Sequence, residues 1–575
     1  MSRFYVGLSV SGHDPAFAVV DDAGRVLFAE ATERFLQDKR AWGAAPDHPT
    51  HLGDVLATLP LDDATVVVAA SWAHAKPSDE EIAGRAANAP DTAAPVESDG
   101  FVTAAQLSWL RHLQRQLFAG VGAHLRTIVP DDRLEIRRYD HHLAHAAYAA
   151  ASSPFDDATC VVIDGEGEVG STSVFDLRQR RLQRRWRSWG PGSLGAYYSW
   201  LTSLCGFDWR AGEEWKVMGL AALGAADPVL VAALVNTLVI DRGRPVLAGP
   251  DAFAAARAAA APFVRRRGAP VEMAAVLAAS GQAAYAQLAD RVVGAALPDG
   301  GGGALVLSGG CALNSAYNGT LRRRFELAAV HVPCAPADDG NAVGAALLAW
   351  LDAHPEQGLP RGVASPFLGT RPSTREVAAA ARHMGGAGVH AAGDTAAHVA
   401  RLLADGRIVG VMRGAAEFGP RALGHRSILA DPRRPEMKDE INRRVKGREP
   451  YRPFAPAVLA ESASDWFDDA QPSPYMSFAL RWRGGAHDRV PAVVHADGTG
   501  RLQTIAADEN PWMHDVTTAF ARLTGVPIVL NTSFNVMGKP IAHSVGDALA
   551  VFGTTGLDAL VLDDVVLEKP AAATT

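Results

Sequence analysis

Residues 4–30, FYVGLSVSGHDPAFAVVDDAGRVLFAE, form three runs rich in apolar residues that are separated by two short turns. The runs at 4–10, 16–20 and 25–30 predict three β-strands in a meander, joined by SGHDP and DDAG. The pattern returns from residue 160, where CVVID is followed by the turn GEGEVG and by the runs STSVFD and LQRRWRSW. Two meanders with acidic, glycine-containing first turns predict a duplicated α/β unit, and two unrelated hairpins are the alternative. Such turns commonly hold phosphate or metal, because glycine lets backbone N–H groups approach and a carboxylate binds a cation.

The composition of the chain changes at residues 354–375, which carry four prolines and no apolar periodicity. We therefore expect an α/β domain over 1–355, a linker over 356–375 and a second α/β domain over 376–575. The second domain should begin with a helix at 377–384 and contain the strands RIVGVM, VPIVLN and LDALVLD.

Several segments of the first domain carry further patterns. Leucines at positions 107, 110, 113 and 117 predict an amphipathic helix between the two meanders. Residues 76–100 are polar and interrupted by proline and glycine, which predicts a surface loop or a lid over a site. The alanine-rich residues 252–296 predict helices interrupted at RRRGAP, and the basic run at 178–187 predicts the solvated face of a hairpin strand.

The composition of the whole chain argues against several classes of protein. In 575 residues there are 55 Lys and Arg against 63 Asp and Glu, and the net charge of −8 argues against a non-specific nucleic-acid binder. The four cysteines are scattered, so we expect neither a disulfide scaffold nor a thiolate zinc site. No apolar run approaches the ~20 residues of a membrane span, and His13 and Asp14 stand where a signal peptide is still apolar. We expect a cytoplasmic enzyme with neither nucleic acid nor membrane as a partner.

The segment YDHHLAH, residues 139–145, predicts a metal site. His141 and His145 are four residues apart, so both imidazoles project from one face of a helix. A zinc-protease helix would place Glu directly after the first His, where this chain has His142, which disfavours a metalloprotease. Asp164 after a strand and Asp338 in an acidic turn that opens a helix are the candidate carboxylate ligands. Histidines that merely cap and pack a helix are the alternative.

Two further positions in the first domain are candidates for binding or catalysis. Ser308-Gly309-Gly310 follows the strand ALVL and opens a helix, which fits a phosphate cradle, although such turns are common. His13, beside Gly12 and Asp14 in the first turn, is a candidate general base or substrate ligand, and a purely structural histidine is the alternative.

The second domain carries a dense set of cations on irregular backbone. Residues 417–427 read EFGPRALGHRS and residues 446–454 read KGREPYRPF, so Arg and Lys alternate with Gly and Pro. Rigid loops that present guanidinium groups suit bidentate recognition of phosphate or carboxylate. Arg501 and the run NTSFN at 531–535 are candidates for further contacts to an oxyanion. An internal salt-bridge network is the alternative, with Glu417, Asp431 and Glu449 as its acids.

Taken together, these motifs resemble those of the NodU/CmcH/TobZ-type O-carbamoyltransferase family. The matching text is GLSVSGHDPAFAVV, DHHLAHAAYA, VVIDGEGE, EEWKVMGLA, SGGCALN, EFGPRALGHRSILADPR, VKGREPYRPFAP and NTSFN, and the resemblance runs nearly end to end. It implies a duplicated actin/sugar-kinase-like (ASKHA, RNase H-like) N-terminal domain and a YrdC-like C-terminal α/β domain.

The resemblance also implies an activity and its substrates. The C-terminal domain would join carbamoyl phosphate and ATP, with Mg²⁺, into carbamoyladenylate. This intermediate would then pass through the interior to the N-terminal domain. There the carbamoyl group would be transferred to a hydroxyl of a small natural product, such as an antibiotic-type polyketide, macrolide or sugar.

The resemblance assigns roles to residues at the matching positions. In the C-terminal domain, the groups expected to bind the carbamoyl phosphate and ATP are Arg421, Lys446, Arg501, Ser533 and Asn535. In the N-terminal domain, the ligands of a divalent metal, expected to be iron, are His141, His145 and Asp338, with Asp164 close by. Gly309, Gly310 and Asn314 would contact the adenylate, His13 would orient or deprotonate the acceptor hydroxyl, and Lys39 would help to hold the adenylate.

Other functions remain as alternatives to this interpretation, among them a sugar kinase, which would leave the arginine-rich C-terminal domain without a role. Another is a tRNA threonylcarbamoylation-type enzyme, which the acidic balance of the chain disfavours. A third is a non-enzymatic nucleotide-binding regulator with a degenerate actin-like fold. The sequence leaves open which molecule and which hydroxyl is the acceptor, which metal is bound, and the oligomeric state, for which a homodimer is one option.

Overall fold

The computed structural model describes residues 3–60, 64–76, 100–298, 301–383, 388–391 and 394–570. The chain divides into two compact units. The first consists of Met1–Leu36, Arg40–Asn314 and Leu321–Ala364, and the second of Gln37–Lys39, Ser315–Thr320 and Ser365–Thr575. The change of unit at residues 364–365 falls within the stretch expected to be a linker, and no helix or strand forms over residues 354–373. The loop expected at 76–100 lies, over residues 77–99, outside the described residues.

The first sheet of the N-terminal unit contains the predicted meander. Its strand order is β3-β2-β1-β4-β5, where β2 is antiparallel to its neighbours and β1, β4 and β5 are parallel. The strands are β1 (Arg3–Ser9), β2 (Ala16–Asp21), β3 (Val26–Ala31), β4 (Thr65–Ser71) and β5 (Leu134–Tyr139). The three strands expected within residues 4–30 are therefore confirmed.

The second sheet repeats the first. Its order is β8-β7-β6-β11-β12, again with two antiparallel pairs followed by two parallel pairs. The strands are β6 (Ala158–Ile163), β7 (Thr172–Arg178), β8 (Arg181–Arg187), β11 (Ala304–Ser308) and β12 (Ala329–His331). The predicted duplication is thus confirmed, and the repeated strand order is that of the actin/sugar-kinase-like fold. Burial alternates along β8, so the basic run lies on a partly solvated hairpin strand as expected.

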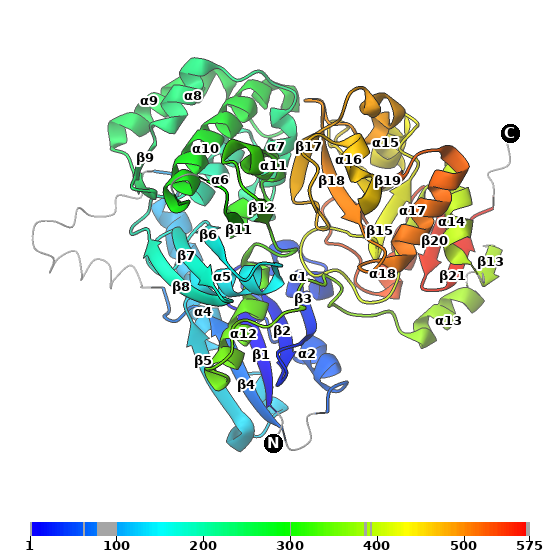
Figure 1. Cartoon of the computed structure of the whole chain (residues 1–575), viewed down its shortest axis with the longest axis horizontal. Coiled ribbons are helices and arrows are strands. Elements are labelled where there is room, and N and C mark those ends of the chain that lie inside the picture. Colours follow the sequence, from blue (N-terminus) through cyan, green and yellow to red (C-terminus); the bar gives the residue numbers. More distant parts are fainter. Residues whose placement is uncertain are drawn as a thin grey trace, which may run out of the picture. The chain divides into compact units, whose positions relative to one another are not determined.

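Two alanine-rich helices pack between these sheets (Figure 1). Helix α5 (His141–Ser152) contacts β6, β7 and β11, whereas α12 (Asn341–Ala353) contacts β1, β2 and β4. The helices also contact each other, and small residues make this approach possible: a Cβ on Gly344 would lie 1.9 Å from the backbone oxygen of Ala144. Because α5 carries two predicted metal ligands and α12 follows a third, this contact helps to position the site.

Replacing Gly344 by alanine is expected to lower the free energy of unfolding by about 1–3 kcal/mol, the usual range for overpacking a rigid core. The added methyl group would meet backbone rather than a flexible side chain, so the two helices must separate. The change is measured by denaturant unfolding, with Gly249→Ala as the control, because a Cβ at that glycine meets nothing within 4 Å. Equal stability of the two variants would contradict the proposed tight contact.

The remaining elements of the N-terminal unit lie mainly around the second sheet and include the expected helices. Helix α4 covers the leucine-periodic segment, and α9 and α10 are separated at the predicted interruption. The helices and strands are α1 (Thr32–Leu36), α2 (Pro49–Leu56), α4 (Ala104–Ala119), α6 (Leu194–Leu204), α7 (Glu214–Ala221), α8 (Pro228–Val235), β9 (Leu238–Asp241), β10 (Arg244–Leu247), α9 (Pro250–Ala260) and α10 (Ala275–Ala296). Helix α11 (Ser315–Arg324) is divided between the two units after Thr320.

The C-terminal unit is built on a nine-stranded mixed sheet of order β13-β21-β20-β14-β15-β19-β16-β18-β17. The strands are β13 (Gly388–Ala391), β14 (Val409–Met412), β15 (Arg426–Ala430), β16 (Ala455–Leu459), β17 (Phe478–Arg481), β18 (Thr499–Ile505), β19 (Ile528–Ser533), β20 (Ala559–Leu562) and β21 (Val565–Glu568). The helices are α13 (Thr374–His383), α14 (Thr395–Ala404), α15 (Met437–Ile441), α16 (Ala463–Trp466), α17 (Pro511–Thr524) and α18 (Val545–Thr554). The expected strands correspond to β14, β19 and β20, and the expected first helix to α13.

Candidate active site

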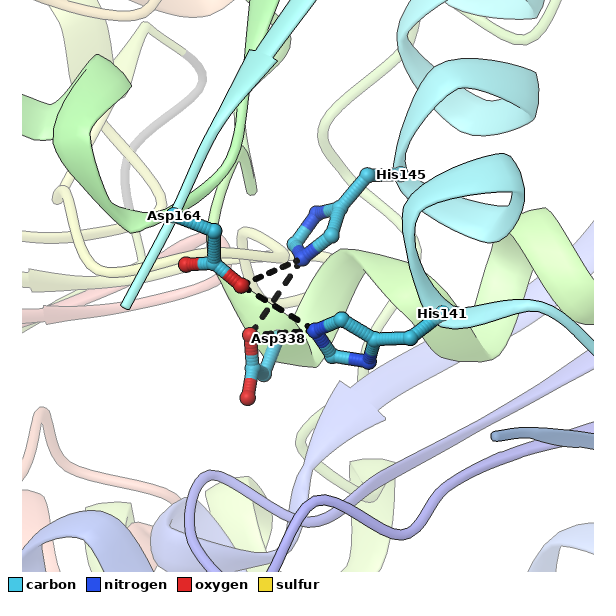
Figure 2. A group of neighbouring side chains, drawn as sticks. All are labelled: His141, His145, Asp164 and Asp338. Carbon is cyan, nitrogen blue, oxygen red and sulfur yellow. Dashed lines mark hydrogen bonds and ion pairs between the residues drawn. The ribbon is translucent and has the colours of Figure 1, made fainter. Parts of the chain in front are cut away.

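Four predicted residues converge in the interior of the N-terminal unit (Figure 2). The Nε2 atoms of His141 and His145 face a carboxylate oxygen of Asp164 at 3.1 and 3.4 Å, and one of Asp338 at 3.5 and 3.3 Å. All four side chains are buried, and their four candidate ligand atoms lie within 4.8 Å of one another. The structure therefore brings together the whole set of candidate metal ligands.

Local structure explains how each ligand is presented. Asp140 caps α5 by accepting a hydrogen bond from the backbone N–H of Leu143 at 2.9 Å, which starts the helix at the first histidine. Asp164 follows β6 directly, and its second oxygen accepts the N–H of Gly310 at 2.9 Å. Asp338 lies in the turn that leads into α12.

The surroundings fix the orientation of the histidines. The side-chain amide of Asn341 lies 3.1 Å from Nδ1 of His141, and the indole of Trp72 packs on the same imidazole with ring centroids 4.6 Å apart. His142 points elsewhere, because its Nδ1 lies 2.9 Å from the hydroxyl of Ser173. His142 is therefore a packing residue, whereas His141 and His145 face the acids.

The electrostatics fit a divalent cation. Burial lowers the pKa of His141, but Asp338 and Asp164 outweigh this effect and raise the pKa to about 10. Burial raises the pKa of Asp338, but His141 and His145 outweigh it and hold that pKa well below its usual value. Nε2 of His145 is buried without a hydrogen bond. Two imidazole nitrogens and two carboxylates suit a first-row transition metal, which would take the place of the protons.

His13 lies beside this cluster in the turn between β1 and β2. Its Nδ1 is 2.9 Å from Oδ2 of Asp14, 3.0 Å from Nη2 of Arg40 and 3.7 Å from Oδ2 of Asp338. When Nδ1 donates its proton to Asp14, Nε2 becomes the basic nitrogen of the ring. Arg40 also donates to Asp14 at 2.9 Å, so it fixes the carboxylate that in turn holds the imidazole. Sequence reasoning missed Arg40, whose only signal was its position next to Lys39.

The residues predicted to contact the adenylate have different surroundings in the structure. Gly309 has a φ of 89°, and a Cβ there would lie 2.3 Å from the carbonyl oxygen of Ile163, so only glycine fits. Asn314 exchanges side-chain hydrogen bonds of 3.1 Å with Gln282. Lys39 belongs to the second unit, where its charge contributes to lowering the pKa of Lys446.

A cationic group forms in the C-terminal unit around Lys446. Its ammonium donates to Oδ1 of Asn535 at 2.7 Å, to the hydroxyl of Ser533 at 3.2 Å and to the backbone oxygen of Ser533. Burial lowers the pKa of Lys446 well below its usual value, and Arg448, Arg452 and Lys39 lower it further. Three of the predicted residues are thus in direct contact.

Arg421 and Arg501 complete this cationic group. Burial lowers the pKa of Arg421 to about 10. Burial also holds the pKa of Arg501 well below its usual value, and Arg421, Arg448 and Arg452 add to the effect by repulsion. Within the described ranges, the side chains of Arg421 and Arg501 make no hydrogen bond or ion pair. Arg448 and Arg452 were not selected from the sequence, although both stand in KGREPYRPF.

Within the described residues, none of the acids proposed for an internal salt-bridge network pairs with Lys446, Arg421 or Arg501. Oε1 of Glu417 accepts the backbone N–H groups of Leu423, His425 and Arg426 at 2.7, 2.8 and 3.0 Å, which holds the loop around Arg421. Asp431 pairs with Arg433 at 2.7 Å, and Glu449 contacts Arg452 at 3.5 Å. The cationic group therefore keeps an excess of positive charge, as an anion-binding site requires.

Stabilisation of the protein by inorganic pyrophosphate is expected to weaken as pH rises from 7 towards 10. The lowered pKa of Lys446 means that the lysine loses its proton below its usual value of 10.5, and pyrophosphate then loses a partner. Affinity should fall by up to about tenfold per pH unit above that lowered pKa. In the ligand-free protein the sign is opposite: folded Lys446 binds fewer protons than unfolded Lys446, so its contribution to stability rises with pH up to its usual pKa of 10.5.

Thermal unfolding with and without pyrophosphate measures both effects. Lys446→Met removes the titrating group and should flatten both pH profiles. A pyrophosphate effect that stays constant from pH 7 to 10 in the wild-type protein would exclude Lys446 as the titrating cation.

Comparison with known proteins places the chain in a family. The family model described as Carbamoyltransferase N-terminus matches residues 5–347, and the one described as Carbamoyltransferase C-terminus matches residues 400–569. The chain belongs to the carbamoyltransferase family. As a carbamoyltransferase it is an enzyme, and the predicted membership is confirmed.

Relatives support the same membership. Nodulation protein U of Sinorhizobium fredii is 31% identical over 97% of this chain and 98% of its own length. Nodulation protein NolO of Bradyrhizobium diazoefficiens is 36% identical over 76% of this chain and 79% of its own. Among solved structures, full-length HypF in the phosphate- and nucleotide-bound form has a TM-score of 0.37 and 13% identity, over 61% of this chain and 55% of that chain.

For this carbamoyltransferase the expected fold class is also confirmed. The repeated sheets form the actin/sugar-kinase-like domain, and the C-terminal family model covers the α/β domain for which the resemblance implies a YrdC-like fold. Among the helices of the described residues, none is long and apolar enough to cross a membrane.

Proposed function

We propose that this carbamoyltransferase makes carbamoyladenylate in its C-terminal unit and transfers the carbamoyl group to a hydroxyl in its N-terminal unit. The main support is the cationic group around Lys446, because Arg421 and Arg501 are cations without partners within the described residues. Partly buried cations that repel one another are stabilised by an anion of high charge. Carbamoyl phosphate and the phosphates of ATP with Mg²⁺ supply that charge.

The atoms of the first step balance when one water molecule takes part. Water releases phosphate from carbamoyl phosphate, and the resulting carbamate displaces pyrophosphate from the α-phosphate of ATP. Arg421, Arg501 and Lys446 would stabilise the charge on the transferring groups, and Ser533 and Asn535 would orient them. Both phosphate and pyrophosphate are therefore expected products.

The second step would use the buried cluster of the N-terminal unit. His141, His145, Asp164 and Asp338 would hold a divalent ion, proposed to be iron, which supplies Lewis-acid polarisation when bound. Gly309, Gly310 and Asn314 would contact the adenylate in the same unit. His13, held by Asp14, would accept the proton of the acceptor hydroxyl through Nε2.

The acceptor is proposed to be a small natural product, such as a polyketide, macrolide or sugar. A tRNA threonylcarbamoylation-type reaction is the alternative, and it requires threonine and bicarbonate in place of carbamoyl phosphate. A cytoplasmic location, expected from the sequence, accords with a reaction that consumes ATP.

The first experiment omits the acceptor. The metal-loaded protein is incubated with ATP, Mg²⁺ and carbamoyl phosphate, and carbamoyladenylate and pyrophosphate are measured by mass spectrometry. Formation of both supports the proposal. If neither forms, whereas threonine with bicarbonate yields an adenylate, the tRNA-type alternative replaces it.

A further inference from the structure

Three tryptophans gather beside His13 in the N-terminal unit. The ring of Trp42 lies 4.9 Å from the imidazole of His13, at an interplanar angle of 64°. Trp109 lies 4.7 Å from Trp42, and Trp209 lies 6.1 Å from it. The indoles come from distant parts of the chain, so the folded structure builds a continuous aromatic group next to the proposed base. We call Trp42, Trp109 and Trp209 the indole cluster.

The indole cluster is held in place but remains open to solvent. Nε1 of Trp42 donates to the backbone oxygen of Arg210 at 2.6 Å, which fixes that ring by its polar edge. Trp109 is 37% exposed, whereas Trp42 and Trp209 are half-buried. An exposed indole that packs on a second indole beside a candidate base suits stacking on a ligand ring.

The acids closest to the indole cluster each have a cation nearby, and Arg40 is shared by Asp14 and, at 4.0 Å, Glu214. Asp14 contacts Arg40 at 2.9 Å, and the guanidinium of Arg40 lies 5.0 Å from the centre of the Trp42 ring. Two further acids nearby have cationic partners of their own: Glu213 contacts Lys216 at 2.6 Å and Asp208 contacts Arg210 at 3.1 Å. Because the guanidinium of Arg40 already lies over the Trp42 ring, that ring is not open to a cation–π interaction with a polycationic acceptor.

We propose that the indole cluster binds the acceptor, and that this acceptor presents an uncharged, flat ring face with the reacting hydroxyl at its edge. This inference rests on the proposed function, because it identifies the acceptor class of the same reaction. The acceptor oxygen forms a bond to the carbamoyl carbon, the bond from that carbon to the adenylate oxygen breaks, AMP leaves, and the hydroxyl proton passes to His13. An aromatic ring and the C–H face of a neutral sugar share the required chemistry.

Direct binding tests the inference without turnover. Quenching of tryptophan emission and calorimetry are used with three probes: a hydroxyanthraquinone, cellobiose and the polycation kanamycin. A neutral probe is expected to bind, and Trp109→Ala should weaken that binding at least tenfold while Trp109→Phe restores most of it. Trp189→Ala is the matched control, because Trp189 is 63% exposed and belongs to the same unit.

The outcomes separate the inference from the proposed function. Binding of the hydroxyanthraquinone alone, or of cellobiose alone, supports the inference and identifies the kind of ring. Preference for kanamycin, binding of no neutral probe, or equal affinities in Trp109→Ala and Trp189→Ala overturns it. Failure to form carbamoyladenylate in the acceptor-free assay contradicts the proposed function. The binding experiment needs no turnover, so it still shows whether the indole cluster binds a neutral ring.

Discussion

Replacing Arg421 by alanine is expected to slow carbamoyladenylate formation by about 10²–10³-fold, the usual effect of removing one donor to a developing oxyanion. The side chain of Arg421 makes no hydrogen bond or ion pair within the described part of the chain, and it is proposed to bind the anionic substrates. Arg501 and Lys446 remain in the variant and still attract the anion. The assay omits the acceptor and compares initial rates of pyrophosphate release.

Stability distinguishes this role from a structural one. Arg421 lowers the pKa of Arg501 by repulsion, so its removal should leave the ligand-free protein as stable as before or more stable. Activity and stability are thus expected to change in opposite directions. Arg421→Lys keeps the charge but loses the planar fork, and should recover only part of the rate. Arg483→Ala, at an exposed arginine of the same unit, is the control. Loss of stability together with activity would indicate that Arg421 supports the fold.

The parts of the molecule that sequence predicted well are those set by local pattern. The positions of the strands in the two meanders can be predicted from short apolar runs between turns. Once the duplication is recognised, the same strand order is expected in both sheets. His141 and His145 could be paired because helical spacing alone brings them together. Asp164 and Asp338 could be selected from the sequence because Asp164 directly follows a predicted strand and Asp338 lies in the turn before a predicted helix.

The parts that sequence could not predict depend on contacts between distant residues. Trp42, Trp109 and Trp209 share no motif, and only folding brings α4 and two separate turns together. Arg40 has a positive φ of 60°, and this turn directs it towards His13 while Lys39 belongs to the other unit. The motif KGREPYRPF contains the missed Arg448 and Arg452, but a loop sequence does not tell which of its cations point inwards.

Replacing Asp338 by asparagine is expected to lower the affinity for the divalent metal more than about 100-fold and to abolish carbamoyl transfer. The change removes one of two carboxylates that face the imidazoles of His141 and His145, and loss of a ligand costs more than loss of a residue that only orients one. Carbamoyladenylate formation should persist, because the cationic group belongs to the C-terminal unit. Metal content, adenylate formation and transfer are measured on the same sample.

Asp339→Asn provides a control at the neighbouring position. Burial and the charges of Asp14 and Glu33 raise the pKa of Asp339 to about 7, so a neutral amide resembles the form already populated near neutral pH. Asp339 is outside the group of four converging ligands, and its variant should keep both metal and transfer activity. If Asp338→Asn retains metal as well as Asp339→Asn does, Asp338 is not a ligand. If Asp338→Asn loses adenylate formation together with metal, the two steps are not divided between the units, because a defect in the N-terminal cluster should leave adenylation intact.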